Sequence, residues 1–137
     1  MNIQTYSIQL RDSVVNPNEP LTKEQNCVAH YRKASSSSNQ LLYQVFLYLE
    51  GKDLPFVKRV KYILHDSFRN PVQLVEQTTL NQNCSIAIWT WGIFWVKAEV
   101  EDVKGRIIKL EHYLTYGKQI ENKRELGISF KEDPRGI

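Results

Sequence analysis

Apolar and polar residues alternate along most of the chain, a pattern that predicts β-strands rather than helices. The clearest alternation covers residues 94–101, where every second position is apolar: Phe94, Val96, Ala98 and Val100. The intervening positions are Trp95 and three charged residues. The segment therefore predicts a strand with one buried face and one mostly exposed face.

Similar patterns, separated by turn residues, predict further strands. In residues 41–50, one face carries Leu41, Tyr43, Val45, Leu47 and Leu49, and a turn follows at 51–53. Shorter strands are expected at 3–10, 57–64, 72–75 and 84–89. A hairpin turn at Lys104-Gly105 precedes a strand with Ile108, Leu110, His112 and Leu114 on one face. Residues 127–130 are a candidate last edge strand.

The N-terminal third is less regular. Residues 11–20 carry Asn and Pro residues and predict a loop. Residues 21–33 fit a short helix, but their apolar positions are too sparse to decide. Residues 35–39, SSSSN, predict a flexible surface loop.

Length and strand count together favour one mainly β domain. The chain has 137 residues, which suits one hydrophobic core. About seven short strands, no strong helix and no internal repeat predict an antiparallel β-sandwich. We expect a single domain over 1–137 with a core at about 41–117. Residues 1–40 would supply a strand and loop, and 118–137 a polar C-terminal extension.

Charge and hydropathy narrow the functional classes. A net charge of +3 is too small and scattered for a nucleic-acid footprint, so no nucleic acid is expected as a partner. The basic cluster Lys58, Arg59 and Lys61 suits a solvated strand face, with phosphate binding as the alternative. The longest nearly apolar stretch, residues 86–96, falls short of the roughly 20 residues that span a bilayer. With no visible secretory signal either, a cytoplasmic location without membrane association is expected.

The candidate catalytic and metal-binding residues do not form a convincing constellation. His65-Asp66-Ser67 has the residue types of a hydrolase triad, but an extended chain would point Asp66 away from the other two. Cys27 and His30 have a C-x-x-H spacing that Cys84 and His112 would have to complete as a zinc site, and nothing repeats it. The sequence therefore predicts no enzyme, no metal and no cofactor. The two cysteines are expected to remain thiols without a disulfide.

The aromatic residues carry more information. Four of them fall within seven positions: Trp89, Trp91, Phe94 and Trp95. One interpretation is a sandwich core with a bulge at Gly92. The other is an aromatic binding slot at the sandwich end, where Gly92 lets a ligand approach the backbone.

Two motifs resemble the YEATS domain, and especially its prokaryotic branch. They are LHDSF at 64–68, followed by Asn70-Pro71, and WGIF at 91–94. The resemblance covers residues 43–116 and implies an immunoglobulin-like β-sandwich. Eukaryotic YEATS domains read acetyl-lysine and longer acyl-lysines such as crotonyl-lysine. The implied function is thus a non-enzymatic reader of acyl-lysine or a similar flat acyl group.

The resemblance also implies roles for individual residues. Phe68 and Trp91 would be the two rings that hold the acylamide, and Ser67 would hydrogen-bond its amide. The backbone N–H of Trp91 would donate to the acyl oxygen. The pocket would be lined by His65, Gly92 and Phe94. The implied partner is an acylated lysine peptide.

The sequence departs from the family at three places. Thr90 stands where a glycine is common, Ile93 replaces a residue that is often acidic or small, and residues 76–83 lack the proline-proline-aromatic element of many eukaryotic members. These departures bear on the ligand rather than the fold. The alternative function is protein–protein interaction, as a sensor or adaptor of a prokaryotic defence or signalling system without acyl-lysine binding. Trp95, on the wetter face of its strand, motivates that alternative.

Overall fold

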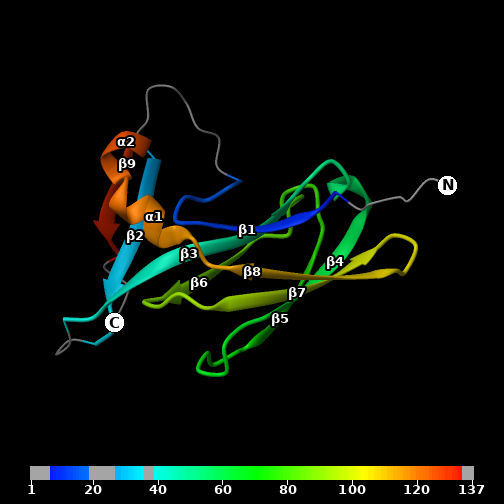
Figure 1. Cartoon of the computed structure of the whole chain (residues 1–137), viewed down its shortest axis with the longest axis horizontal. Coiled ribbons are helices and arrows are strands. Elements are labelled where there is room, and N and C mark those ends of the chain that lie inside the picture. The colour runs from blue at the N-terminus through cyan, green and yellow to red at the C-terminus, as the bar shows by residue number, and fades with distance from the viewer. Residues whose placement is uncertain (1–6, 19–26, 36–38, 134–137) are drawn as a thin grey trace. The chain divides into compact units, whose positions relative to one another are not determined.

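The protein is mainly β, as its alternating pattern predicts (Figure 1). The computed structural model describes residues 7–18, 27–35 and 39–133. These residues form two sheets, joined by short helical segments. They group into two compact units, one around the four-stranded sheet and one around most of the five-stranded sheet.

The four-stranded sheet is a regular antiparallel sheet. Its strands are β4 (Val57–Ile63), β5 (Val72–Glu76), β7 (Trp95–Asp102) and β8 (Ile107–Tyr113). Their order is β5-β4-β7-β8. The buried face places Val60 opposite Val100 and Tyr62 opposite Ala98, which are all almost inaccessible to solvent. The strands predicted at 57–64, 72–75 and 94–101 are confirmed, and alternation assigned the buried faces of the first and the last correctly.

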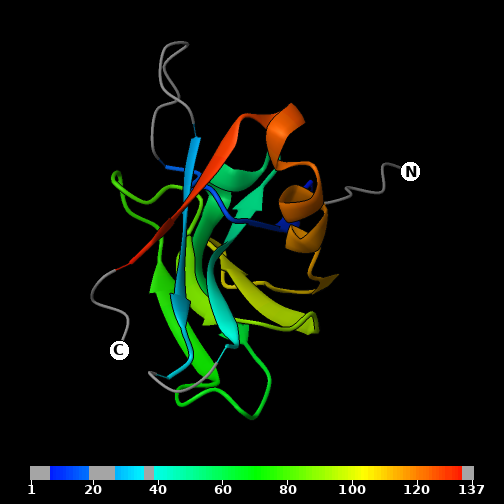
Figure 2. The same cartoon turned by 90° about the vertical axis from the view of Figure 1, so that its left-hand side faces the viewer.

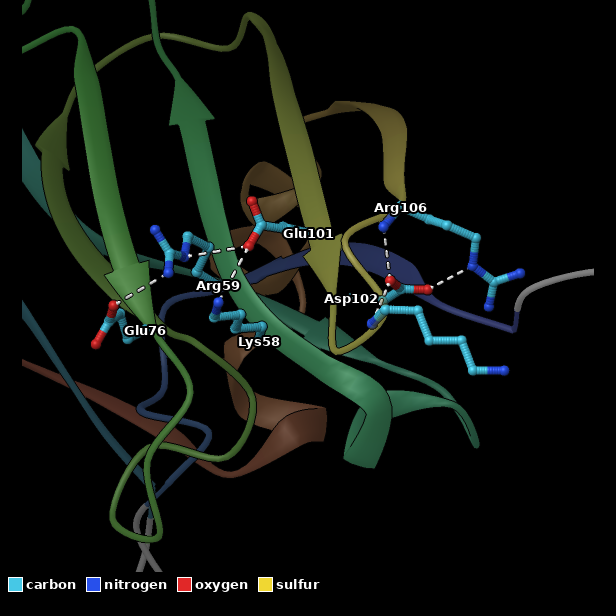
Figure 3. A network of polar contacts seen from close by, with 7 residues as sticks. Lys58, Arg59, Glu76, Glu101, Asp102 and Arg106 are labelled. Carbon is cyan, nitrogen blue, oxygen red and sulfur yellow. Dashed lines mark hydrogen bonds and ion pairs between the residues drawn. The ribbon is translucent and has the colours of Figure 1, made fainter.

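The opposite face of this sheet carries charged residues that pair with one another (Figure 3). Arg59 contacts Glu76 at 3.7 Å and Glu101 at 3.5 Å, and Lys58 lies 3.8 Å from Glu101. The basic cluster is thus largely a solvated strand face. Such exposed pairs each contribute about 1 kcal/mol or less to stability.

Asp102 organises the β7–β8 hairpin (Figure 3). Its buried carboxylate accepts hydrogen bonds from the backbone N–H groups of Lys104 and Arg106 and from Arg106 Nε, at 2.8 to 2.9 Å. Gly105 has φ of 82°, a conformation that glycine adopts without strain. The predicted Lys104-Gly105 turn is confirmed.

The five-stranded sheet contains β1 (Gln9–Ser13), β2 (Cys27–Lys33), β3 (Leu41–Glu50), β6 (Ile86–Thr90) and β9 (Ile128–Glu132). The order is β1-β3-β2-β9, and β6 also pairs with β3. The predicted strand at 41–50 is confirmed with its buried face, where Val45, Leu47 and Leu49 are fully buried. Figure 2 shows β9, in red, running beside β2.

The C-terminal part is more structured than a polar extension. Helices α1 (Tyr116–Glu121) and α2 (Lys123–Leu126) precede β9. β9 confirms the candidate edge strand predicted at 127–130. β9 pairs with β2 in parallel, with Ala29 opposite Phe130. The expectation of antiparallel pairing throughout is wrong at this pair, because the helices carry the chain back to the same end of the sheet. A short 3-10 turn, η1 (Leu54–Phe56), also lies between β3 and β4.

Two N-terminal predictions need correction. Residues 11–13 belong to β1 rather than to a loop. Residues 27–33 form β2, so the helical alternative for this segment is wrong where it is described. The parts of these two predictions at 19–26 lie outside the described residues, as do residues 3–6 of the predicted strand at 3–10 and residues 36–38 of the predicted loop at 35–39. In the described part of the chain, no helix has the length and apolar character needed to cross a membrane.

Alkaline pH is expected to destabilise the fold. Burial raises the pKa of Tyr62, raises that of Cys84 to about 11 and raises that of Tyr116 to about 12. The folded state therefore keeps protons that the unfolded chain releases first, so the free energy of unfolding falls as pH rises. We expect the Tm to be steady below about pH 9 and to fall between about pH 9 and 12. Thermal melts of wild type and Cys84→Ala across this pH range would check the expectation. The Tm of the variant should fall less than that of wild type, because the variant lacks one of the buried groups. A Tm that does not decrease up to pH 12 would contradict the expectation.

Candidate functional site

The connection between β4 and β5 carries one part of the predicted site. The backbone N–H of Leu64 donates to Pro71 O at 2.7 Å and closes the connection. Inside it, the Phe68 N–H donates to His65 O at 3.1 Å, which forms a tight turn. The segment is therefore a turn, and the extended conformation considered for His65-Asp66-Ser67 is wrong.

A short hydrogen-bonded pair occupies this turn. The backbone N–H of Ser67 donates to His65 Nδ1 at 3.1 Å, and Ser67 Oγ lies 2.8 Å from the same nitrogen. Because Nδ1 accepts from the backbone N–H, we assign the ring proton to Nε2, and the Ser67 hydroxyl then shares the Nδ1 lone pair as a second donor. The oxygen of Ser67 then keeps lone pairs that can accept another hydrogen bond. Both side chains are exposed.

Two phenylalanine rings lie close to this pair. The centroid of Phe94, which immediately precedes β7, lies 5.4 Å from that of Phe68 and 6.1 Å from that of His65. The interplanar angles of 54° and 60° are those of tilted rather than stacked rings. Phe68 and Phe94 are half-buried. This unit therefore brings together His65, Ser67, Phe68 and Phe94, four of the six residues that the sequence predicts for the site.

The other two residues, Trp91 and Gly92, belong to the second compact unit. Trp91 follows the end of β6, and its side chain is 67% exposed. A Cβ atom on Gly92 would meet no atom within 4 Å, so the space beside this backbone is open. An exposed Trp91 contradicts the interpretation of this segment as core. Trp89 does not share a strand face with it, because β6 ends at Thr90.

Thr90 and Tyr116 hold the backbone of this second segment. The Gly92 N–H donates to Thr90 Oγ1 at 3.3 Å, and the Tyr116 hydroxyl donates to Gly92 O at 2.8 Å. Thr90, which stands where a glycine is common in the family, thus holds the turn through its hydroxyl. Tyr116 is buried and packs against Tyr43 at a centroid distance of 6.3 Å.

Tyr116 was not among the residues predicted for the site. Its position after the last predicted core strand gave no signal, because an isolated tyrosine among polar residues resembles a surface residue. The Thr90-x-Gly92 spacing did hold a signal, since serine and threonine hydroxyls often bond the backbone two residues ahead.

Neighbouring aromatics outside the predicted site have their own partners. The guanidinium of Arg32 lies 4.2 Å from the ring centroid of Trp89 and forms a cation–π contact. Trp95 is 60% exposed and packs against Tyr113 at 5.3 Å. Among the described residues, no group of three or more His, Cys, Asp or Glu side chains is arranged for a metal ion. The side chain of Cys27 lies outside the described set, and Cys84 is buried as a free thiol.

Comparisons with solved structures identify the fold. The YEATS domain of Yaf9 is 16% identical, with a TM-score of 0.51 over 88% of this chain and 82% of that chain. The Yaf9 YEATS domain recognizing an H3K122suc peptide is 17% identical, with a TM-score of 0.49 over 87% and 81%. The Yaf9 YEATS domain bound to H3K27ac is 17% identical, with a TM-score of 0.48 over 84% and 78%. Yaf9 is described as a yeast AF-9 homologue. The first of these likenesses and the two sheets confirm the predicted immunoglobulin-like β-sandwich class.

No curated protein matches the sequence. A family model does match: the prokaryotic YEATS domain, at residues 43–115. The match covers more than half of the chain and contains both motifs from which the resemblance was inferred. The chain therefore belongs to the prokaryotic YEATS domain family, whose members are binding modules rather than enzymes.

Proposed function

We propose that this domain binds acyl-lysine, or a similar flat acyl group, and that Phe68 and Trp91 supply the two rings that contact the acylamide. The observation that carries the proposal is the turn at 65–68. In this turn, Ser67 is hydrogen-bonded to His65, and the next residue, Phe68, packs its ring against Phe94. A hydrogen-bonding group next to a ring surface suits a ligand that is planar, neutral and polar at its centre.

Ser67 would accept a hydrogen bond from the acylamide N–H. Its hydroxyl proton is directed to His65 Nδ1, 2.8 Å away, so its oxygen is oriented as an acceptor. An N–H donor on the ligand complements this arrangement, whereas a ligand oxygen would compete with His65 for the same proton. His65 would act by positioning Ser67.

Trp91 and Gly92 would contribute the second ring and a backbone donor. An indole that is 67% exposed has apolar surface to gain by covering a flat ligand group. The open space beside Gly92 lets a ligand approach the main chain, and the N–H of Trp91 would donate to the acyl oxygen. Thr90 and Tyr116 keep this segment ordered before the ligand arrives, which lowers the entropic cost of binding.

Selectivity against unmodified lysine follows from desolvation. Moving an ammonium next to ring faces removes water from a charge, and neither Ser67 nor the N–H of Trp91 replaces that water with an anionic partner. An acylamide has no such cost and satisfies both hydrogen bonds. We expect acylated peptides to bind at least about tenfold more tightly than the same peptide with a free lysine, a difference of about 1.4 kcal/mol.

A titration followed by backbone NMR tests the proposal. Matched peptides with acetyl-, butyryl-, crotonyl- and unmodified lysine are added to isotope-labelled protein up to millimolar concentration. The proposal expects saturable shifts at Ser67, Phe68 and Trp91 with the acylated peptides, and weakening of about tenfold in Ser67→Ala from loss of one hydrogen bond. Flat titrations with all three acylated peptides on a folded protein would contradict it.

A further inference from the structure

The outer edge of β8 carries a self-complementary pattern that acyl-lysine binding does not use. β8 is the last strand of the four-stranded sheet, and in the described part of the chain its only hydrogen-bonded strand neighbour is β7. An edge strand presents unpaired backbone N–H and C=O groups, to which another strand can bind.

The hydrogen-bonding register shows which residues present those groups. Asp102 N donates to Arg106 O at 2.9 Å, so the backbone groups of this pair face each other across the hairpin. Because such pairs alternate along an antiparallel ladder, the backbone groups of every second residue in β8 point away from β7. These residues are Ile107, Lys109, Glu111 and Tyr113.

The same four residues also place their side chains on the exposed face of the sheet. Ile107 is 51% exposed and Tyr113 is 48% exposed, and the two charged residues between them are exposed as well. Read along the strand, this face is aliphatic, positive, negative and aromatic.

Two copies of this pattern complement each other when they run antiparallel. With Leu110 on a twofold axis, Lys109 lies opposite Glu111 of the partner subunit. Ile107 then lies opposite Tyr113 of the partner subunit, and both pairings occur twice by symmetry. Opposite charges and aromatic–β-branched pairs are the cross-strand combinations that stabilise antiparallel strands.

The neighbouring strand β7 extends the complementarity. Lys97 lies opposite Glu111, and Glu99 opposite Lys109, in the β7–β8 register. In the paired sheet, Glu111 would therefore lie between two lysines, and Lys109 between two glutamates. Trp95, which packs against Tyr113 at 5.3 Å, would enlarge the apolar contact at each end.

The other edge of the sheet lacks this property. In β5 the corresponding side chains are Val72, Leu74 and Glu76, of which Leu74 is 71% exposed. Antiparallel self-pairing about Leu74 would place Val72 opposite Glu76 of the partner subunit. An apolar side chain opposite a carboxylate forms neither an ion pair nor an apolar contact. The charge pattern thus favours β8 as the self-associating edge.

We propose that two copies of this domain associate through antiparallel pairing of their β8 strands and form one continuous eight-stranded sheet. One strand edge per subunit is a small contact, near the low end of the usual range of about 1,200–2,000 Å² in total. The dimer should accordingly dissociate on dilution. The proposal does not depend on acyl-lysine binding.

Sedimentation equilibrium of the whole chain from low micromolar to millimolar concentration provides the test. Wild type should shift from the monomer mass of 16.1 kDa toward twice that value. Lys109→Glu and Glu111→Lys should each weaken self-association at least tenfold, because each places like charges opposite one another across the interface. An equimolar mixture of the two variants should associate again, since both pairs across the interface of the mixed dimer, residue 109 of one subunit with residue 111 of the other, are then oppositely charged.

Two further variants separate this interface from others. Lys109→Pro removes an N–H that points away from β7, so it should block pairing without breaking the hairpin. Leu74→Glu alters the β5 edge and should leave the association unchanged. Circular dichroism confirms that each variant is folded. A wild type that stays monomeric at millimolar concentration, or a dimer that persists in folded Lys109→Pro, would overturn the proposal.

Discussion

Replacing Asp12 by alanine is expected to lower the free energy of unfolding by about 3 kcal/mol. Asp12 is 7% exposed, and its carboxylate accepts hydrogen bonds from Thr115 N, Thr115 Oγ1 and Tyr116 N, at 2.8 to 3.0 Å. The Tyr116 N–H lies at the first residue of helix α1 and is buried, so without the carboxylate it would have no partner. The loss corresponds to a fall in Tm of about 10 °C.

Asp66→Ala is the matched control, because Asp66 is an exposed aspartate in the β4–β5 turn. Its free energy of unfolding should stay within about 0.5 kcal/mol of wild type. Asp12→Asn should be intermediate, since the amide oxygen can still accept but its NH₂ group would face a backbone donor. Urea denaturation of the three variants gives the comparison. An equal effect of Asp12→Ala and Asp66→Ala would show that the Asp12 network contributes nothing to stability.

Replacing Trp91 by alanine is expected to weaken acyl-lysine binding by about thirtyfold or more, which corresponds to roughly 2 kcal/mol for removal of a large aromatic anchor. The fold should survive, because the Trp91 side chain is 67% exposed and supports no core. Phe68→Ala should weaken binding to a similar degree. Because Phe68 packs against Phe94, the Phe68→Ala variant is expected to be less stable. The affinity of this variant must therefore be measured well below its Tm.

Trp95→Ala provides the control for these binding measurements. It removes a side chain of the same type and similar exposure, 60%, from a face of β7 that the proposal does not assign to the ligand. Isothermal titration at a concentration where the protein is monomeric should give wild-type affinity for this variant. If Trp95→Ala weakens binding as much as Trp91→Ala, the ligand is held by a different aromatic surface.

The sequence was most informative where the structure depends on residues close together in the sequence. Alternation located β3, β4, β7 and β8 and assigned their buried faces, because side chains of a strand point in turn to its two sides. The turn at Lys104-Gly105 was equally clear, because glycine has a local conformational reason to be there. The LHDSF motif and the Phe94 of the second motif also indicated residues that the structure brings together at the β4–β5 turn.

Long-range contacts were not predictable in this way. Asp12 meets Thr115 across 103 residues of sequence, and no periodicity records such a contact. The asparagines and prolines that follow Asp12 made its segment resemble a loop. β9 was a candidate strand, but its parallel pairing with β2 depends on two short helices whose apolar positions are too few to give a helical period. Tyr116 was missed for the same reason, although it holds the Gly92 carbonyl.

The central claim is that one acyl group contacts the rings of both Phe68 and Trp91. The most direct measurement is an isotope-filtered NOE experiment on wild-type protein with a crotonyl-lysine peptide, observing the crotonyl methyl and vinyl protons. The account predicts NOEs from these protons to the aromatic protons of Phe68 and to the indole protons of Trp91. Binding with NOEs to neither ring, or to other aromatic residues such as Trp95 and Tyr113 in their place, would contradict it.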